Sequence, residues 1–137
     1  NVTSYAGFFN VNNTCDNNLF FWFFTAESNW LEAPVLLWLQ GGPGTSSMLG
    51  LFDIVGPFAS LPEGLQRRNY SWSNISNLLF IDNPVGTGFS YSTGDCYPVT
   101  IPEVSEQLHS ALLQFFLMFP ELVRNKFFIT GQSFGGH

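Results

Sequence analysis

The chain has 137 residues, a length that suits one domain, and 45% of them are hydrophobic while only 10% are charged. This balance excludes a disordered tail, because sixteen Phe and four Trp supply ample material for a core. The net charge of −6 argues against nucleic acid and anionic membrane surfaces as partners, and no apolar run reaches membrane-spanning length.

The first part of the chain predicts an antiparallel hairpin. Residues 4–11 and 19–25 are rich in aromatic and β-branched side chains, and the Asn/Asp-rich stretch 12–18 separates them. Three short, continuous apolar runs follow, and each has the pattern of a strand buried on both faces. These runs are residues 34–39, 78–81 and 127–130.

A glycine-rich turn comes after each of these apolar runs. The turns lie at residues 40–44, 86–88 and 131–136. In a parallel sheet the carboxyl ends of the strands share one edge, where active sites gather, so we expect the three turns to meet there.

One long helix is expected to begin near Ile101. Thr100 can cap it, Pro102 suits its first turn, and Glu103 completes a capping-box pattern before Pro120 ends the helix. Its apolar positions recur at helical spacing and are Val104, Leu108, Ala111, Leu112, Phe115 and Phe119.

The remaining segments predict less regular structure. We expect a short helix at residues 46–52, a polar loop at 61–77 and a turn-rich segment at 82–94. Taken together, the pattern predicts an α/β fold in which a hairpin precedes parallel strands and a long helix.

Two features indicate the secretory route. Four N-x-S/T sequons offer glycosylation sites, at Asn1, Asn12, Asn69 and Asn74, although sequons also arise by chance in an Asn-rich chain. Cys15 and Cys96 either bond to each other, pair with cysteines outside these residues, or remain as two buried thiols. The polar start has no leader pattern, as expected of a mature or trimmed chain.

The pentapeptide Gly131–Gly135 is a G-x-S-x-G motif directly after an apolar run. In α/β-hydrolases this motif forms a nucleophile elbow, which here lifts the Ser133 hydroxyl above the sheet. An ordinary Gly/Ser turn is the competing interpretation. The acid and the base follow the serine in that fold, and only four residues follow Ser133, so neither partner is expected here. We expect His137 to point away from Ser133 or to pack beneath it.

The Gly41-Gly42-Pro43-Gly44 turn lies after the first of the three apolar runs, residues 34–39. Hydrolases of this kind use a backbone N–H from an early strand-to-helix loop in the oxyanion hole, and glycine leaves that N–H unobstructed. An ordinary surface loop is the alternative.

At this point the chain resembles a known family. The segments WLQGGPGTSS, IDNPVGTGFSYS and FFITGQSFGG are similar to those of the serine carboxypeptidases, and the details look closest to vitellogenic carboxypeptidase-like members. The resemblance implies that residues 1–137 are the N-terminal portion of one α/β-hydrolase domain with an incomplete sheet.

The resemblance also implies site residues. Ser133 would be the nucleophile, and the N–H groups of Gly42 and Phe134 would form the oxyanion hole. Gln40, Gly41 and Gln132 would bind the terminal carboxylate of a peptide substrate. No cofactor and no metal are implied. A secreted or lysosomal protein is expected, with a C-terminal half or second chain as a partner.

Four positions depart from the family pattern. Gln132, Phe134 and Thr45 stand where Glu, Tyr and Cys are usual, and Ile54 aligns with an acidic position. These departures leave open a second interpretation, a non-catalytic carboxypeptidase-like binding protein. An acyltransferase on the same scaffold is a third, since an alcohol can intercept an acyl-serine.

Overall fold

The computed structural model describes residues 2–137, so the Asn1 sequon lies outside the described residues. The strands are β1 (Ser4–Asn12), β2 (Asn17–Phe24), β3 (Val35–Leu39), β4 (Phe58–Leu61), β5 (Gly64–Arg67), β6 (Asn77–Ile81), β7 (Tyr91–Ser92) and β8 (Phe127–Gly131). The helical elements are α1 (Ile101–Met118) and the short turns η1 (Gly50–Ile54), η2 (Trp72–Asn74), η3 (Pro120–Leu122) and η4 (Ser133–Gly136).

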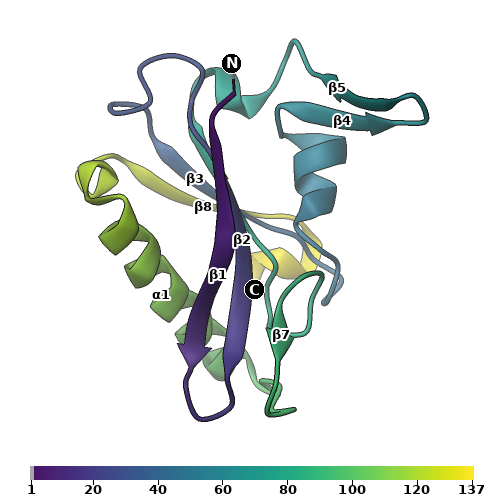
Figure 1. The fold of residues 1–137 in the computed structure, drawn as a ribbon, viewed down its shortest axis with the longest axis vertical. Coiled ribbons are helices and arrows are strands. Elements are labelled where there is room, and N and C mark those ends of the chain that lie inside the picture. Colours follow the sequence, from purple (N-terminus) through teal and green to yellow (C-terminus); the bar gives the residue numbers. More distant parts are fainter. Residues whose placement is uncertain (1) are drawn as a thin grey trace.

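The main sheet joins the predicted hairpin to the predicted parallel strands. Its order is β1-β2-β6-β3-β8, with the short β7 paired to β2 (Figure 1). β1 and β2 are antiparallel, β2 meets β6 antiparallel, and β3 lies parallel to both β6 and β8. The hairpin and the parallel arrangement are therefore confirmed, and the carboxyl ends of β6, β3 and β8 share one edge.

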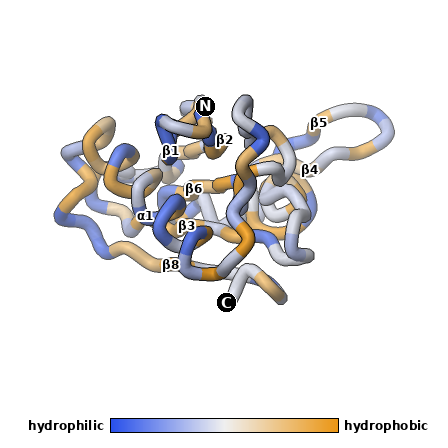
Figure 2. The backbone as a smooth tube through the Cα atoms, turned by 90° about the horizontal axis from the view of Figure 1, so that it is seen from below, coloured by the Kyte–Doolittle hydropathy of each residue, from blue (hydrophilic) through white to orange (hydrophobic). Residues whose placement is uncertain are grey.

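Two apolar cores cover the two faces of this sheet. On one face α1 packs over the sheet, with Ala111 and Phe115 fully buried against Phe23 and Leu37. On the other face the segment around η1 closes the core, and its buried members are Phe24, Trp38, Met48, Leu51, Val55, Leu78 and Phe80. Figure 2 shows hydrophobic segments around β6 and β3, between α1 and the β4–β5 hairpin.

β8 corrects the expectation of a strand buried on both faces. Phe128 is 49% exposed and Ile129 is 61% exposed. β8 pairs only with β3, so it forms an edge of the sheet, and no described element covers its outer side. An apolar edge of this kind favours contact with further protein.

Two other segments are more ordered than the sequence suggested. The expected loop at 61–77 contains part of a separate two-stranded sheet, β4–β5, in which Pro62 and Glu63 form the hairpin turn and Gly64, at the start of β5, has φ +116°. An ion pair between Arg67 and Glu27 holds this hairpin to the body. The turn-rich segment 82–94 contributes β7, and the short helix expected at 46–52 extends to Ile54 in η1.

The expected start of α1 is confirmed. The Glu103 backbone N–H donates to Thr100 Oγ1 over 3.4 Å, and Glu103 Oε2 accepts from the Thr100 N–H at 3.0 Å and the Val99 N–H at 2.8 Å. The pKa of the Glu103 carboxyl is lowered by these hydrogen bonds, most by the one from the Val99 N–H and next by the one from the Thr100 N–H. Among residues 2–137, no helix is both long enough and apolar enough to cross a membrane.

We expect Thr100→Ala to lower the free energy of unfolding by about 1 kcal/mol, because the first turn of α1 loses its side-chain acceptor. Chemical denaturation of the natural protein that carries these residues would measure the change. Ser105→Ala is the matched control, since this exposed serine lies inside α1 and makes no side-chain hydrogen bond in the described structure. Equal stability of the two variants would contradict the capping role.

Candidate active site

A buried carboxylate ties two of the three glycine-rich turns together. Asp82, at the end of β6, accepts from Ser46 Oγ at 2.7 Å, from the Ser47 N–H at 2.7 Å and from the Phe89 N–H at 2.9 Å. A side chain at Gly88 would collide with this carboxylate. The segment after β3 and the 86–88 turn are therefore fixed relative to each other.

Ser47 extends the hydrogen-bond network of Asp82 to Gln40, at the start of the 40–44 turn. Its Oγ accepts from the Gln40 N–H at 3.1 Å and donates to the Ile81 carbonyl at 2.6 Å. Ser47 is 1% exposed, so these bonds lie away from water. The position of Gln40 is consequently set by the neighbouring strand β6.

Ser133 occupies a sharp turn between β8 and η4. Its φ is +56°, a conformation that costs energy for a residue with a side chain and that is typical of strained functional turns. Gly135 allows the turn to form, since a side chain there would overlap the Leu39 carbonyl. Ser133 is exposed, and its hydroxyl has no hydrogen-bond partner among the described residues.

The 40–44 turn packs directly on Ser133. A Cβ at Gly41 would lie 2.6 Å from the Gln132 carbonyl oxygen, 2.8 Å from the Phe134 nitrogen and 2.9 Å from Ser133 Cβ. Gly41 is buried, and the next residue, Gly42, has φ +124°. Only glycine at position 41 lets the two turns meet this closely.

A chain of hydrogen bonds fixes the orientation of two amide side chains. The Trp38 indole N–H donates to Gln40 Oε1 at 3.1 Å, and Gln40 Nε2 donates to Gln132 Oε1 at 2.6 Å. An indole nitrogen can only donate, so Gln40 must offer its oxygen to Trp38 and its NH2 to Gln132. The Gln132 NH2 group is thereby left facing away from this pair. Gly50 leaves room for the Trp38 ring.

Two of the three turns, 40–44 and 131–136, line one small pocket of about 90 Å³ beside Ser133, together with Asn83 and Pro84 from the segment that precedes the 86–88 turn. Its lining residues are Leu39, Gln40, Pro43, Asn83, Pro84, Ile101, Val104, Ser105, Leu108, Phe134, Gly135 and His137. Asn83 Oδ1 is buried without a hydrogen-bond partner. The 40–44 and 131–136 turns therefore meet as expected, whereas the 86–88 turn joins them only through Asp82 and the segment after β3.

Neither histidine contacts Ser133 through a hydrogen bond in the described part of the chain. The His137 ring stacks on Phe134, with 4.8 Å between centroids and 17° between planes. His109 lies on the exposed side of α1. Residues 2–137 also contain no group of three or more His, Cys, Asp or Glu placed to hold a metal ion.

The sequon asparagines of the described residues, Asn12, Asn69 and Asn74, lie outside this site. Asn12, at the end of β1, accepts the N–H groups of Thr14 at 3.1 Å and Cys15 at 3.2 Å. Asn69 and Asn74 are exposed in one connector, where Asn74 Nδ2 donates to the Asn69 carbonyl at 3.2 Å.

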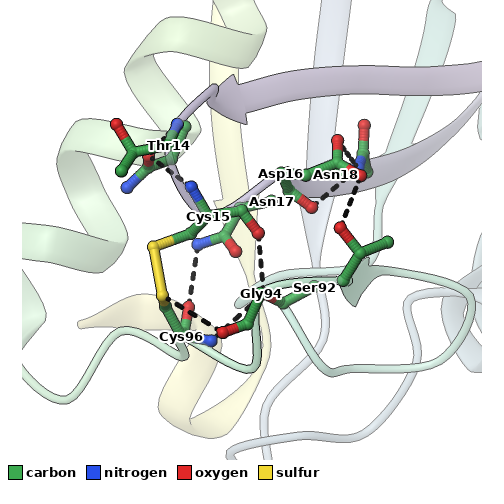
Figure 3. The surroundings of a disulfide bond; sticks show 10 residues. Thr14, Cys15, Asp16, Asn17, Asn18, Ser92, Gly94 and Cys96 are labelled. Atoms are coloured by element: carbon green, nitrogen blue, oxygen red, sulfur yellow. Dashed lines mark hydrogen bonds between the residues drawn. A yellow bond between two sulfur atoms is a disulfide. The ribbon is translucent and has the colours of Figure 1, made fainter.

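The structure joins Cys15 to Cys96 by a disulfide, shown in Figure 3. This bond ties the turn of the β1–β2 hairpin to the segment before α1. Among the possibilities that the sequence left open, the described structure therefore has the two cysteines paired with each other.

Trp38 is a site residue that the sequence analysis did not single out. Trp38 and Gln40 are two residues apart, so the alternation of a strand would have placed them on one face. Asp82 also helps to build the site, through partners Ser46 and Ser47 that come from a different loop.

Comparisons with known proteins agree with this geometry. The family model described as "Serine carboxypeptidase" matches residues 1–137. The venom serine carboxypeptidase of Apis mellifera is 51% identical over 98% of this chain, and the vitellogenic carboxypeptidase of Aedes aegypti is 44% identical over 98%. The chain spans 29% of the length of each of these relatives.

A solved structure has the same fold. It is that of Kex1(delta)p, a prohormone-processing carboxypeptidase from Saccharomyces cerevisiae, with a TM-score of 0.87 and 32% identity over 97% of this chain and 31% of that one. The likeness confirms the α/β-hydrolase fold with an incomplete sheet. On the family match and these identities, the chain belongs to the serine carboxypeptidase family.

Proposed function

We propose that residues 1–137 supply the nucleophile and the carboxylate-binding groups of a serine carboxypeptidase. In this reaction Ser133 Oγ attacks the carbonyl carbon of the last peptide bond, while a base takes the hydroxyl proton. The amine of the terminal amino acid leaves with a proton, and water then releases the peptide from the acyl-serine. The strained, exposed Ser133 turn packed against Gly41 is the observation that carries the proposal.

The oxyanion hole is assigned to the N–H groups of Gly42 and Phe134. Gly41 brings the first turn into contact with the Phe134 nitrogen, which supports a shared position for a carbonyl oxygen beside Ser133. Phe134 lacks the hydroxyl of the usual tyrosine, but the oxyanion contact uses its backbone and is unaffected by that change.

Recognition of the substrate terminus is assigned to Gln40, the Gly41 N–H and Gln132. The Trp38–Gln40–Gln132 chain of hydrogen bonds supports this role. It turns the NH2 group of Gln132 away from Gln40 and leaves it free to donate to a carboxylate. Neutral donors bind a carboxylate without adding a like charge beside it. This preference for a free terminus is what makes the proposed enzyme an exopeptidase.

The acid and the base of the triad are assigned to protein outside residues 1–137. A longer chain or a separate second chain would bring them to Ser133. The exposed β8 edge supports such an association, since Phe128 and Ile129 would be covered by further strands. We therefore expect the 137 residues alone to be inactive.

A non-catalytic binding protein is the second candidate. Gln132, Phe134, Thr45 and Ile54 favour it, because four positions of the usual pattern are changed. The donors for a carboxylate would persist in such a protein, so it would still bind peptide termini.

The secretory pathway is the proposed location, either for secretion or for a lysosome. The Cys15–Cys96 disulfide supports an oxidising compartment, and the exposure of Asn69 and Asn74 supports glycosylation there. The similarity to a venom protein supports secretion.

We expect a fluorophosphonate probe to label Ser133 in the complete natural protein, because a triad-activated serine forms a covalent adduct with it. Mass spectrometry of the labelled peptide would identify the site. Ser133→Ala should abolish the adduct, while Ser60→Ala, at an exposed serine of β4 outside the pocket, should retain it. A folded, glycosylated protein without any adduct at Ser133 would reject the enzyme in favour of the binding protein.

We expect Gly41→Ala to slow this labelling by at least about tenfold, because the new Cβ pushes the first turn away from Ser133 and Phe134. Gly136→Ala is the matched control, since a Cβ there meets nothing within 4 Å. The labelling rate of each variant would be compared at equal folded fractions. Labelling of Gly41→Ala at the rate of the control would refute the role of the contact.

We expect Gln132→Glu to make peptide binding strongly pH-dependent. An ionised Glu accepts from Gln40 but turns its second oxygen toward the substrate carboxylate, so affinity falls as the pH rises through the carboxyl pKa, ordinarily about 4.3. The loss should reach about tenfold at neutral pH. Gln132 cannot titrate, so the native residue should give a much flatter profile.

Calorimetric titration in a Ser133→Ala background measures this binding without turnover. A C-terminally amidated peptide is the control, since it lacks the repelled charge and should show little difference between the two proteins. Superimposable pH profiles for the free-acid peptide would contradict the assignment of Gln132.

A further inference from the structure

Three exposed apolar side chains border a groove beside η2. Tyr70 is 92% exposed, Ile75 is 76% exposed and Trp72 is 42% exposed. The groove has a volume of about 370 Å³, and its other lining residues are Ile54, Val55, Ser71 and Asn74. None of these residues lines the pocket beside Ser133. Apolar surface gathered in a groove indicates a contact that covers it.

The backbone of the groove is firmly held. Ser71 Oγ and the Trp72 N–H both donate to the Val55 carbonyl, at 2.8 Å and 3.0 Å. The Trp72 carbonyl accepts from the Ser76 N–H at 3.0 Å and from Ser76 Oγ at 2.7 Å. The Trp72 ring also packs edge to face on Trp38, with 5.8 Å between centroids. A groove that is fixed before its occupant arrives loses little freedom when the occupant packs into it.

The walls favour an uncharged occupant with one apolar face. None of the lining residues carries a charge, and the aromatic rings of Tyr70 and Trp72 lie beside the polar side chains of Ser71 and Asn74. The C–H face of a sugar ring packs well on an aromatic face, while its hydroxyl groups stay with water and polar neighbours. A sugar therefore fits these walls better than an ion or a purely apolar chain.

Asn74 supplies a covalent link at the groove itself. It is the acceptor of the sequon Asn74-Ile75-Ser76, it is exposed, and it lines the groove. Its Nδ2 uses one hydrogen to donate to the Asn69 carbonyl at 3.2 Å, which leaves the other hydrogen for replacement by a sugar. Asn69, the acceptor of the neighbouring sequon, does not line the groove. A sugar tethered to Asn74 is held at a high effective concentration beside Trp72.

We propose that the first N-acetylglucosamine of an N-linked glycan on Asn74 packs in this groove against Trp72. In the transfer, Asn74 Nδ2 bonds to C1 of the sugar and loses a proton, while the C1–O bond to a lipid-pyrophosphate donor breaks and the pyrophosphate leaves with the electron pair. Ser76 is only 2% exposed, so the transfer precedes the folding of this turn. The inference rests on the glycosylation proposed above and adds what the sugar contacts.

The test uses the complete natural protein, secreted with its glycans and trimmed by an endoglycosidase to one N-acetylglucosamine at each occupied sequon. Peptide mass spectrometry first measures the occupancy of Asn74 and Asn69 separately. Hydroxyl-radical footprinting then measures the oxidation rate of Trp72, with Trp30, which packs against the core under α1, as the internal reference.

We expect Trp72 to oxidise at least about twofold more slowly in the trimmed protein than in Asn74→Gln, because the sugar covers the exposed part of the indole. Asn69→Gln is the matched control. It removes the neighbouring sugar from the same connector and should leave the oxidation rate of Trp72 unchanged.

A thermal unfolding cycle gives a second measurement. Asn74→Gln should lower the Tm of the trimmed protein by about 2 °C, because the packed sugar is lost. The loss should largely disappear in the Trp72→Leu background, since the sugar and the indole stabilise the fold through one contact. Any effect of Asn69→Gln should be the same in both backgrounds.

The outcomes separate this inference from the glycosylation on which it rests. An occupied Asn74 with Trp72 oxidised as fast as in Asn74→Gln, or equal Tm losses in the two backgrounds, would overturn the contact and leave the glycosylation standing. An unoccupied Asn74 would overturn both. Protection of Trp72 in Asn74→Gln that grows with protein concentration would assign the groove to a second copy of the protein instead.

Discussion

The contact between Gly41 and the turn at Ser133 is the constraint on which the rest of the site depends. Backbone atoms of Gln132 and Phe134 occupy the volume that any side chain at position 41 would need. This packing sets the distance between the first turn and the serine, and the Asp82 and Ser47 hydrogen bonds hold the first turn from its other side. The strain at Ser133 is tolerated because both neighbours of the turn are fixed.

The sequence predicted the hairpin, the parallel order and the capped helix, since each follows from local periodicity or capping chemistry. It did not predict the exposure of Phe128 and Ile129, because an apolar run looks the same in a central strand as in an edge strand. It also missed the β4–β5 hairpin, whose strands are too short and too exposed to give an alternating pattern.

Within the site, the sequence identified the motif residues because their glycines and serine follow the spacing of known motifs. The sequence pointed to Gln40 and Gln132 but not to the hydrogen bonds that join them to Trp38. The two glutamines are 92 positions apart, and their orientation depends on the indole N–H. The unpaired oxygen of Asn83 carried no sequence signal at all. An unpaired oxygen is a property of the folded packing, where no neighbouring donor reaches it.

Two pockets differ in electrostatic design although both belong to an acidic chain. Around Ser133 the polar groups are neutral amides and backbone N–H groups, which suit an anionic substrate terminus without a competing charge. A second pocket, between the β1–β2 hairpin and the start of α1, is lined in part by Glu103 and Glu106, and the four basic residues of the sequence occur only at positions 67, 68, 124 and 126. A free terminal carboxylate is therefore favoured beside Ser133 and repelled by the acidic pocket.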